Sequence, residues 1–369
     1  MNNNDYQIYF DCGFSKLRTG AINIINSDKA FYTDSKFFLD QKEIDTEIQK
    51  IITTLEKDTN QYIDNINLMI DSPRMISIGI SISKKIDESQ LRQEDIQFLV
   101  QEAKQQILKN YNSQNIVHII INNYKINNVN YDYLPKDIKC NFISLDIIFI
   151  CLPEEIIKYF KSFFYKFNIS INRIICSSYA KAINYKDNFS LYKNISFIDV
   201  GFNKTSITTY IDNKIISMNV IPIGGNNITK DISKLLKIDL VKAENLKIDY
   251  NKNKTFLSNK GFSLKLLHEI IFARTDEIFK ICIKLIKLDF FTTDLHKIIL
   301  MGEGSKILYN LHKDNVNFLY DVDFLEETTK DVCQSGFKLS MGLNKQEVLV
   351  IPKKQIQQGF FEKLFHLFR

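Results

Sequence analysis

Several features that would mark a specialised class of protein are missing from this sequence of 369 residues. Its six cysteines are scattered without any Cys-x-x-Cys pair, so we expect neither a cysteine-based metal site nor a disulfide framework. The most apolar run, residues 142–152, is too short to span a bilayer and is interrupted by Asp146. The first residues are polar and do not resemble a signal peptide.

A strong excess of one charge is also missing. Lysine and arginine number 48 against 43 acidic residues, which leaves a net charge of +5. This excess is too small to indicate nucleic-acid binding, although it suits an anionic membrane surface. The hydrophobic content of 45% allows a large core, and the length allows two to four domains or subdomains. We therefore expect a globular protein of the cytosol that reaches a membrane, if it does, without a spanning segment.

One short motif occurs twice, 188 residues apart. Residues 11–16 and residues 199–204 both read Asp-x-Gly-Phe-x-Lys, and each copy lies between two strand-like runs. The pattern predicts a strand, a tight turn and a returning strand. A repeat this widely spaced suggests two related half-domains that face one another.

Two such turns have a clear chemical use. Turn N–H groups, freed by glycine from Cβ crowding, form a nest for phosphate oxygens. Asp11 and Asp199 can hold Mg²⁺, usually through water. Lys16 and Lys204 can add positive charge beside the phosphates. The alternative is a pair of ordinary hairpins without a ligand.

The second half contains two further glycine turns. Gly224 and Gly225 open a predicted helix, and a helix N-terminus is a natural anion site. The predicted strand 297–301 runs into residues 302–306, Gly-Glu-Gly-Ser-Lys. A strand followed by a glycine turn and a helix is the usual way to admit a base or ribose.

Hydrophobic periodicity outlines the remaining elements. It predicts helices at 43–55, 94–109, 156–167, 229–236, 239–248 and 264–287. A strand hairpin, a helix and a strand form the first half of a ribonuclease-H-like α/β unit. The composition shifts between residues 78 and 167, which predicts an inserted α+β module. Its aromatic stripe in residues 159–167 is expected to be core.

The last residues, 357–369, predict an amphipathic helix. Its apolar face is formed by Phe360, Phe361, Leu364, Phe365, Leu367 and Phe368. Such a helix is too short to span a bilayer, but it can lie in the membrane interface. The alternative is a helix docked on the protein's own core.

With these residues considered together, the chain resembles FtsA, the bacterial actin-like protein that tethers the FtsZ ring to the membrane. The resemblance is strongest in residues 197–207, 220–232 and 243–247, the alphaproteobacterial branch is the most similar, and the tail matches in position and character. It implies an α/β, actin/Hsp70-like fold of two ribonuclease-H-like halves with ATP and Mg²⁺ in the cleft between them. The implied division is 1–77 with 168–193 (first half), 78–167 (inserted subdomain), 194–237 with 291–343 (second half), 238–290 (small subdomain), 344–356 (linker) and 357–369 (membrane helix).

The resemblance also assigns roles to residues. Those implied at the phosphates are Asp11, Gly13, Ser15, Lys16, Asp199, Gly201, Asn203, Lys204, Thr205, Gly224 and Gly225. Those implied at the adenosine are Glu269, Arg274, Gly302, Glu303, Gly304 and Ser305. The implied partners are the FtsZ C-terminal peptide, other FtsA subunits, later division membrane proteins and an anionic membrane, at the cytoplasmic side of the inner membrane at the septum.

Some residues depart from the family pattern. Phe14 stands where a small residue is usual, residues 202–204 replace Gly-Gly-Thr, and Glu303 replaces a glycine. Bulky or acidic residues at these positions hinder close approach of a nucleotide to the backbone. We therefore expect slow or absent ATP turnover, with no catalytic base. Two alternatives stay open, a pilus-assembly actin relative and a sugar-kinase-like phosphotransferase.

Overall fold

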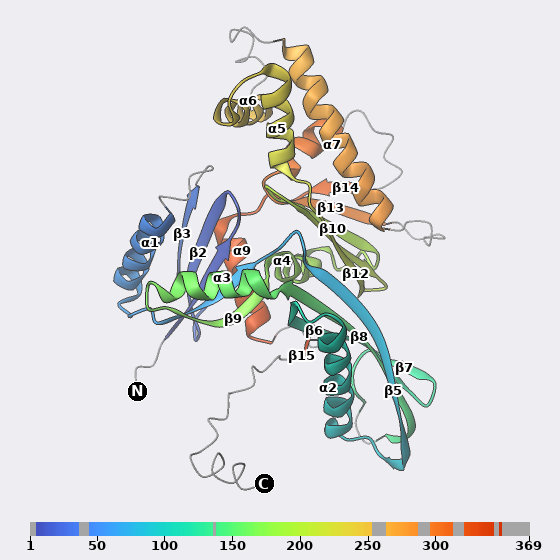
Figure 1. Ribbon diagram of the computed structural model, residues 1–369. Helices are drawn as coiled ribbons and strands as arrows, with labels where there is room; N and C mark the ends of the chain where they lie inside the picture. Colours follow the sequence, from blue (N-terminus) through green and yellow to red (C-terminus); the bar gives the residue numbers. More distant parts are fainter. Residues whose placement is uncertain are drawn as a thin grey trace.

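The computed structural model describes residues 5–36, 44–135, 138–252, 263–286, 296–312, 321–342 and 347–348. Within these ranges the strands form three β-sheets, two of which share one strand order (Figure 1). This duplication places the two repeated motifs opposite each other.

The first sheet belongs to the N-terminal half. Its spatial order is β3 (Ala30–Lys36), β2 (Lys16–Asn23), β1 (Tyr6–Cys12), β4 (Asn65–Ile70) and β9 (Ser170–Cys176). Strands β1 to β3 are antiparallel neighbours, while β4 runs parallel to β1 and β9 runs parallel to β4. The apolar positions of α1 (Ile44–Thr59) are buried at helical spacing. The predicted hairpin, helix and strand are confirmed.

The second sheet repeats this plan. Its order is β12 (Lys214–Ile221), β11 (Thr205–Ile211), β10 (Ile195–Val200), β13 (Lys297–Met301) and β14 (Asp321–Phe324). The first three strands are antiparallel and the last two run parallel to β10. Its helices are α5 (Gly225–Leu236), α6 (Leu240–Lys252), α7 (Leu264–Ile286) and α8 (Ser305–His312). Helices α5 to α7 form the lobe at the top of Figure 1.

Two helices join the halves. Helix α4 (Ser177–Lys186), followed by the short 3-10 helix η2 (Asp187–Phe189), contacts β9 of the first sheet and β11 of the second. Helix α9 (Thr329–Ser340) packs on β1, β2 and α4. One hydrophobic core contains Phe10 from the first sheet together with Phe197 and Ile299 from the second. Because apolar burial is shared, the halves stabilise each other through this core.

The inserted module is an α+β unit with a core of its own. It contains β5 (Ile76–Gln90), α2 (Gln93–Asn110), β6 (Gln114–Ile126), β7 (Val129–Tyr131) and β8 (Lys139–Pro153). Leu99 of α2 and Phe149 of β8 are fully buried in this core. The module projects away from the other two sheets at the lower right of Figure 1.

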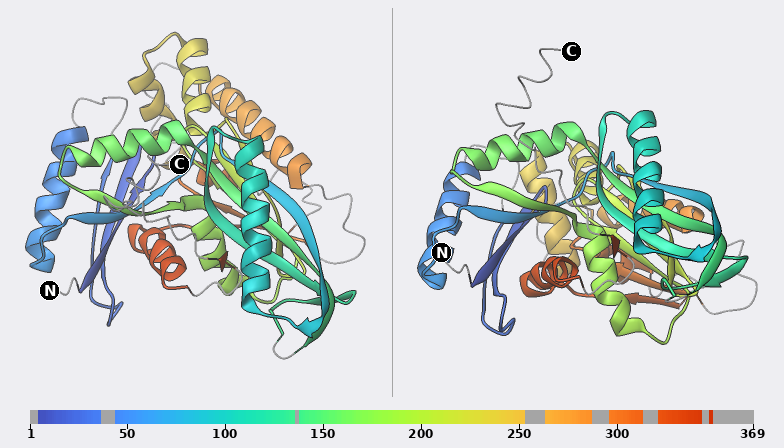
Figure 2. Two further views of the ribbon diagram at one scale, coloured as in Figure 1. Left: turned by 60° about the horizontal axis from the view of Figure 1, so that its bottom comes forward. Right: turned by 90° about the horizontal axis from the view of Figure 1, so that it is seen from below.

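Helix α3 (Glu154–Tyr165) follows the module but packs on the first half (Figure 2). The ring of Phe164 meets that of Phe10 edge-on, with centroids 5.3 Å apart. Phe163 and Phe164 are buried, which confirms the core role expected for them, whereas Tyr159 on the same stripe is 58% exposed.

A short strand, β15 (Glu347–Val348), pairs with β6 at the edge of the module. The Glu347 carboxylate lies 2.7 Å from Nδ1 of His118 and 2.8 Å from the guanidinium of Arg173. Nε2 of the same histidine accepts the N–H of Cys176 at 2.9 Å. These buried contacts attach part of the expected linker to the body.

The apolar residues of the expected membrane helix, residues 360–368, lie outside the described residues. Among the helices that the structure describes, none combines the length and apolar character needed to cross a membrane.

Candidate functional site

The two repeated motifs form the same turn at the edge of the two sheets. In the first, the N–H of Gly13 donates to the carbonyl of Lys16 at 3.0 Å. In the second, the N–H of Gly201 donates to the carbonyl of Lys204 at 2.9 Å. Both hairpins predicted from the repeat are therefore present with matching geometry.

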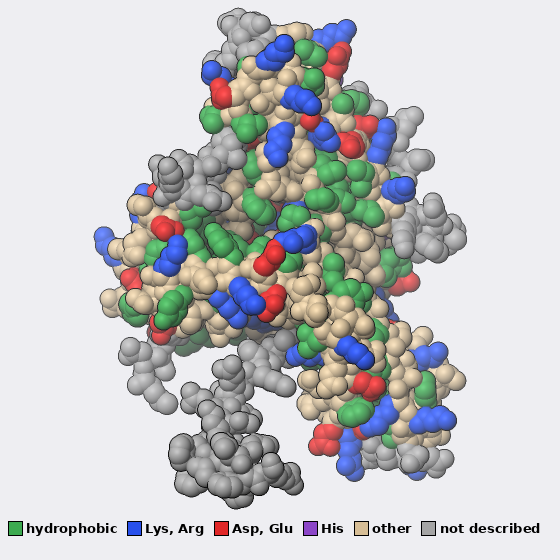
Figure 3. All heavy atoms as spheres, in the orientation of Figure 1, with side chains coloured by type: hydrophobic (Ala, Val, Ile, Leu, Met, Phe, Trp, Pro, Cys, Tyr) green, Lys and Arg blue, Asp and Glu red, His purple; other side chains and the backbone are tan. Residues whose placement is uncertain are grey.

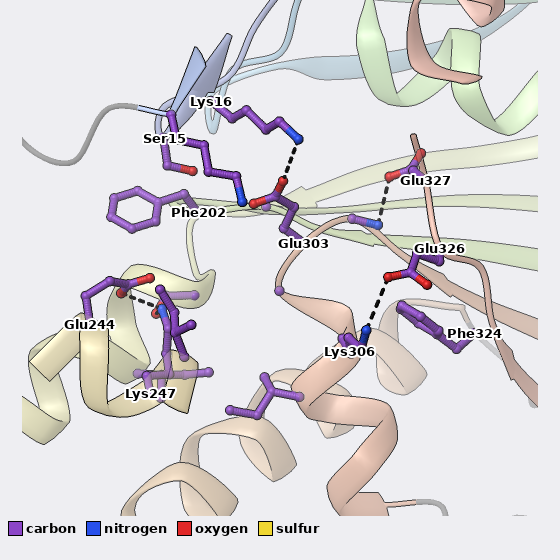
Figure 4. Close-up of a pocket in the computed structure, with 18 of the residues that line it drawn as sticks. Ser15, Lys16, Phe202, Glu244, Lys247, Glu303, Lys306, Phe324, Glu326 and Glu327 are labelled. Carbon is purple, nitrogen blue, oxygen red and sulfur yellow. Dashed lines mark hydrogen bonds and ion pairs between the residues drawn. The ribbon is translucent and has the colours of Figure 1, made fainter. Parts of the chain in front are cut away.

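Two cavities lie between the halves beside these turns. The larger has a volume of about 750 Å³ and is lined by the first hairpin, α5, α6, α8 and the turn after β13 (Figure 4). This size is typical of a small-ligand or cofactor pocket. The smaller has only about 90 Å³. The charged residues that line it include Asp11, Asp71, Lys181, Asp199 and Lys204.

Asp11 is the next-to-last residue of β1 and is buried. Its carboxylate lies 3.0 Å from the Arg18 guanidinium of the same hairpin and accepts the hydroxyl of Ser177 at 2.6 Å. Burial works against the charged form of Arg18, but the neighbouring carboxylates outweigh it and raise its pKa. The first aspartate is thus neutralised locally.

Asp199 is the next-to-last residue of β10 and takes its partner from the other half. Its carboxylate lies 2.7 Å from Nζ of Lys181, which also lies 3.1 Å from Glu327. Burial alone would lower the pKa of Lys181, yet the two carboxylates raise it. Burial, together with the Asp199 charge, raises the pKa of Glu327 above its usual range despite the nearby ammonium group.

Lys204 does not face the larger cavity. Its ammonium group lies 2.8 Å from Asp71, in the segment after β4, and 2.6 Å from the hydroxyl of Ser206. Asp71 also accepts the hydroxyl of Ser178 at 3.1 Å. Burial would raise the pKa of Asp71, but the charge and hydrogen bond of Lys204, together with the Cys176 hydrogen bond and the Lys181 charge, outweigh burial and lower it. Lys204 was expected beside phosphates and instead pairs with an acid.

Lys16 also pairs with acids. Its ammonium group lies 2.9 Å from Asp34 and 3.2 Å from Glu303, which points toward it across the cavity (Figure 4). Arg18 approaches Glu303 at 3.5 Å. Burial would raise the pKa of Glu303, and these two cations lower it instead. The acid that replaces a glycine therefore serves as a charge partner.

The glycine pair before α5 supports the second hairpin. The N–H of Gly225 donates to the carbonyl of Gly201 at 2.9 Å, and that of Asn226 donates to the carbonyl of Phe202 at 2.8 Å. A Cβ on Gly224 would lie 2.5 Å from the Gly201 carbonyl oxygen, so a side chain is excluded there. Gly225 still borders the larger cavity.

The turn after β13 needs its glycines. Gly302 has a φ of +86°, and a Cβ there would lie 2.3 Å from an oxygen of Asp199. A Cβ on Gly304 would lie 2.7 Å from Val200. The hydroxyl of Ser305 donates to the Gly302 carbonyl at 2.7 Å and is buried, so it shapes the turn.

Other predicted phosphate residues have structural partners as well. The buried hydroxyl of Thr205 donates to the Ile223 carbonyl at 2.8 Å, and Asn203 accepts the amide of Asn226 at 2.9 Å. Ser15 borders both cavities.

Helix α6, and not α7, contributes charged residues to the wall of the larger cavity. Glu244 and Lys247 of α6 line it, with 2.6 Å between their charged groups. The predicted Glu269 and Arg274 on α7 are not among the lining residues, and Arg274 pairs with Asp231 at 2.7 Å. The segment 243–247 carried part of the family resemblance, a signal that could have identified this pair.

The two turn phenylalanines lie differently. Phe14 is 49% exposed and does not border the larger cavity, whereas Phe202 does. Both line a third, mainly apolar cavity of about 810 Å³ beside α1 and α3. Hydrophobic side chains gather on this face in Figure 3. The steric hindrance expected from Phe14 therefore does not affect the larger cavity.

The residues of the cleft fit one end of a nucleotide better than the other. The larger cavity has room for a nucleoside with its first phosphates, bordered by Lys247 and Lys306. At the other end the aspartates expected to hold Mg²⁺ already pair with Arg18 and Lys181. Among the described residues, no group of three or more His, Cys, Asp or Glu side chains is arranged to hold a metal ion.

Comparisons with known proteins give the same family. The family model described as "Cell division protein FtsA" matches residues 196–260. FtsA of Buchnera aphidicola subsp. Acyrthosiphon pisum is 26% identical over 351 residues, covering 83% of this chain and 82% of that protein. FtsA of the Schizaphis graminum subspecies is 29% identical over 167 residues, 45% of this chain and 39% of that protein.

A solved structure, of a PilM-PilN type IV pilus biogenesis complex, has a similar fold. Its TM-score is 0.59, and the superposition covers 91% of this chain and 96% of that chain at 10% identity. At this identity the likeness concerns the fold alone. Together with the duplicated sheets and the family matches, it confirms the predicted resemblance and fold. The chain is therefore similar to the cell division protein FtsA and has an actin-like fold.

Proposed function

We propose that this chain is an actin-like cell division protein that anchors the FtsZ ring to the cytoplasmic face of the inner membrane at the septum. The observation that carries the proposal is the 26% identity to a cell division protein over 351 residues, because it extends over most of both chains. The same proposal includes self-assembly and contact with later division proteins.

The membrane role rests on the sequence of the tail. Six phenylalanine or leucine side chains form the apolar face there, with charged residues largely opposite. Burying several such side chains is worth several kcal/mol at about 25 cal/mol per Å² before ordering costs. Subunits that assemble combine weak tails into stronger attachment.

The cleft is proposed to bind an adenine nucleotide, with the nucleoside in the larger cavity. Lys247 and Lys306 would meet its phosphates, and the glycine turn after β13 would lie against the base or ribose. Asp11 and Asp199, which the family resemblance implies for Mg²⁺, already pair with Arg18 and Lys181, so they do not fit the ion. We expect weak or absent hydrolysis.

The FtsZ contact is proposed for the small subdomain around α6 and α7. These helices form an exposed lobe at the far end of the second half (Figure 1). The FtsZ C-terminal peptide would dock there, as the family resemblance implies.

Flotation with vesicles of anionic and neutral lipid tests the tethering role. Phe365→Gln is expected to lower the bound fraction of the full chain about tenfold, because an aromatic ring leaves the acyl region. His366→Gln is the matched control, since it places the same residue on the polar face.

Equal binding of Phe365→Gln and the unaltered chain would contradict the tether. Fluorescence polarisation with the FtsZ C-terminal peptide tests the partner separately. Absence of peptide binding by an assembled, vesicle-bound chain would contradict the FtsZ contact without affecting the membrane result.

A further inference from the structure

The acids beside the two turns are related by the duplication. In the first sheet, Asp71 lies two residues beyond the β4 partner of Asp11. In the second sheet, Glu303 lies two residues beyond the β13 partner of Asp199. Asp71 and Glu303 therefore occupy equivalent positions on opposite sides of the cleft.

Lys16 and Lys204 also occupy equivalent positions, because the backbone carbonyl of each accepts the hydrogen bond that closes its own hairpin turn. Lys204 of the second half reaches Asp71 of the first at 2.8 Å. Lys16 of the first half reaches Glu303 of the second at 3.2 Å. Each half thus gives a cation to the other and receives one from it, a reciprocal arrangement that ordinary hairpins do not require.

A third ion pair crosses between the halves at the centre of the cleft. Lys181 of α4 in the first half lies 2.7 Å from Asp199 of β10 in the second. The side chains of Lys181, Asp199, Lys204 and Asp71 are all less than 10% exposed. Buried charges persist only when they are paired, so separating the halves would leave four charges without partners.

We propose that these three ion pairs form a lock that holds the halves together without a metal ion or a triphosphate. The larger cavity is the proposed nucleotide site, and this part of the inference rests on that proposal. It binds adenine nucleotides without Mg²⁺. The ammonium groups supply, from within the chain, the positive charge that a divalent cation would bring.

Charge and space both support this assignment. A divalent cation between Asp11 and Asp199 would meet Arg18 and Lys181 at the same carboxylates, and like charges at such distances repel. The cavity at these aspartates is only about 90 Å³, against about 750 Å³ on the nucleoside side. The nucleoside side of the cleft is therefore the side with room for a ligand.

The lock is tested by measuring the distance between the halves in the full chain without nucleotide. Spin labels at Lys29→Cys and Lys242→Cys use exposed positions on the first and second half, while the native cysteines described are buried or half-buried. We expect a narrow distance distribution that Mg²⁺ and ATP leave unchanged. A distribution that is broad until Mg²⁺ and ATP are added would overturn the lock.

Two matched variants test the partly exposed contact between Lys16 and Glu303. Glu303→Gln removes the ion pairs to Lys16 and Arg18, both of which cross between the halves, and the side chain is 49% exposed, so folding is expected to survive. Glu326→Gln removes an ion pair of the same 3.2 Å length, to Lys306, that stays within the second half. Only Glu303→Gln is expected to broaden the distance distribution; equal effects would overturn the reciprocal lock.

A double variant tests the buried contact between Lys204 and Asp71. Asp71→Asn with Lys204→Met removes both charges together, so no buried charge is left alone. We expect this double variant to broaden the distribution more than Glu303→Gln does. A folded double variant with an unchanged distribution would overturn the lock.

The ligand class is tested by titrating the unaltered chain with ATP in Mg²⁺ and in EDTA. We expect the same dissociation constant within about twofold, whereas a metal-bridged triphosphate would bind about tenfold or more weakly in EDTA. Loss of affinity in EDTA would overturn the metal-independent site. No binding under either condition would overturn the assigned ligand class and the proposed nucleotide site, and the distance measurements would still decide the lock.

Discussion

The two halves share strand order, the register of the motif hairpin and turn geometry, yet they neutralise their aspartates differently. In the first hairpin Arg18 stands directly opposite Asp11 and pairs with it at 3.0 Å. In the second hairpin Ser206 stands opposite Asp199, and the cation comes from Lys181 of the other half at 2.7 Å. One copy of the motif is therefore self-sufficient, while the other depends on its neighbour.

This difference shows how a duplicated unit can become coupled to its copy. Ser206 carries no charge and accepts a hydrogen bond from Lys204 at 2.6 Å, so the cation that pairs with Asp199 is Lys181 of the other half. Because a buried carboxylate without a partner is costly, the second half is stable only with α4 of the first in place. Substitutions at these two aspartate sites should therefore differ in their cost.

The largest effect is expected for Lys181→Met, which breaks the contact on which the second half depends. Asp199 and Glu327 both lose their buried cation, so the free energy of unfolding should fall by about 3–5 kcal/mol. Urea denaturation at neutral pH measures the loss. Arg18→Met is expected to cost less, since Asp11 keeps the hydroxyl of Ser177 at 2.6 Å.

Lys181→Met with Asp199→Asn is the control for that prediction. Removing both charges should recover part of the loss, because no carboxylate of β10 is then left unpaired. Equal losses for Lys181→Met and Arg18→Met would contradict the proposed dependence of one half on the other.

A smaller effect is expected for Gly302→Ala at the turn of the second half. The φ of +86° and the predicted 2.3 Å approach to Asp199 together should cost about 2–3 kcal/mol. Gly342→Ala is the matched control, because its φ is +73° but a Cβ there meets nothing within 4 Å. That variant should cost about 1 kcal/mol or less in thermal unfolding. Similar losses for both would mean that Asp199 does not crowd the turn.

Much of this fold could be predicted because the signals are local. The repeated Asp-x-Gly-Phe-x-Lys motif specifies its turn through one glycine and one hydrogen bond, whatever the rest of the chain does. Likewise α7, expected at 264–287, is observed as Leu264–Ile286, since a long apolar period needs no distant partner.

The charge partners could not be predicted because they depend on tertiary packing. Lys16 and Lys204 look alike in sequence, and nothing local shows that each reaches an acid of the other half. Lys181 has no recognisable motif around it in the sequence. The departures from the family pattern at Lys204 and Glu303 were visible, but their complementarity appears only when the two sheets face each other.

The pH dependence of stability should distinguish the two buried acid sites, beginning with Asp71. Lys204 holds its folded pKa below the unfolded value of about 3.9, so the pair contributes stability above that pH. The contribution is lost as pH falls through the folded pKa. Asp71→Asn with Lys204→Met should therefore show a flatter fall in unfolding free energy below about pH 4. An unchanged acid limb would contradict the prediction.

The smallest effect is expected at Glu327, with the opposite sign. Burial raises its folded pKa above the unfolded value of about 4.3, so its protonated form contributes stability below that pH. This contribution is lost as pH rises through the raised pKa. Glu327→Gln keeps a neutral side chain beside the Gly302 N–H and should lack that loss, which urea denaturation at several pH values would detect. If Glu327→Gln instead flattened the fall in unfolding free energy at acid pH, the charge of Lys181 would outweigh burial at Glu327. Glu327 and Asp71 would then behave alike.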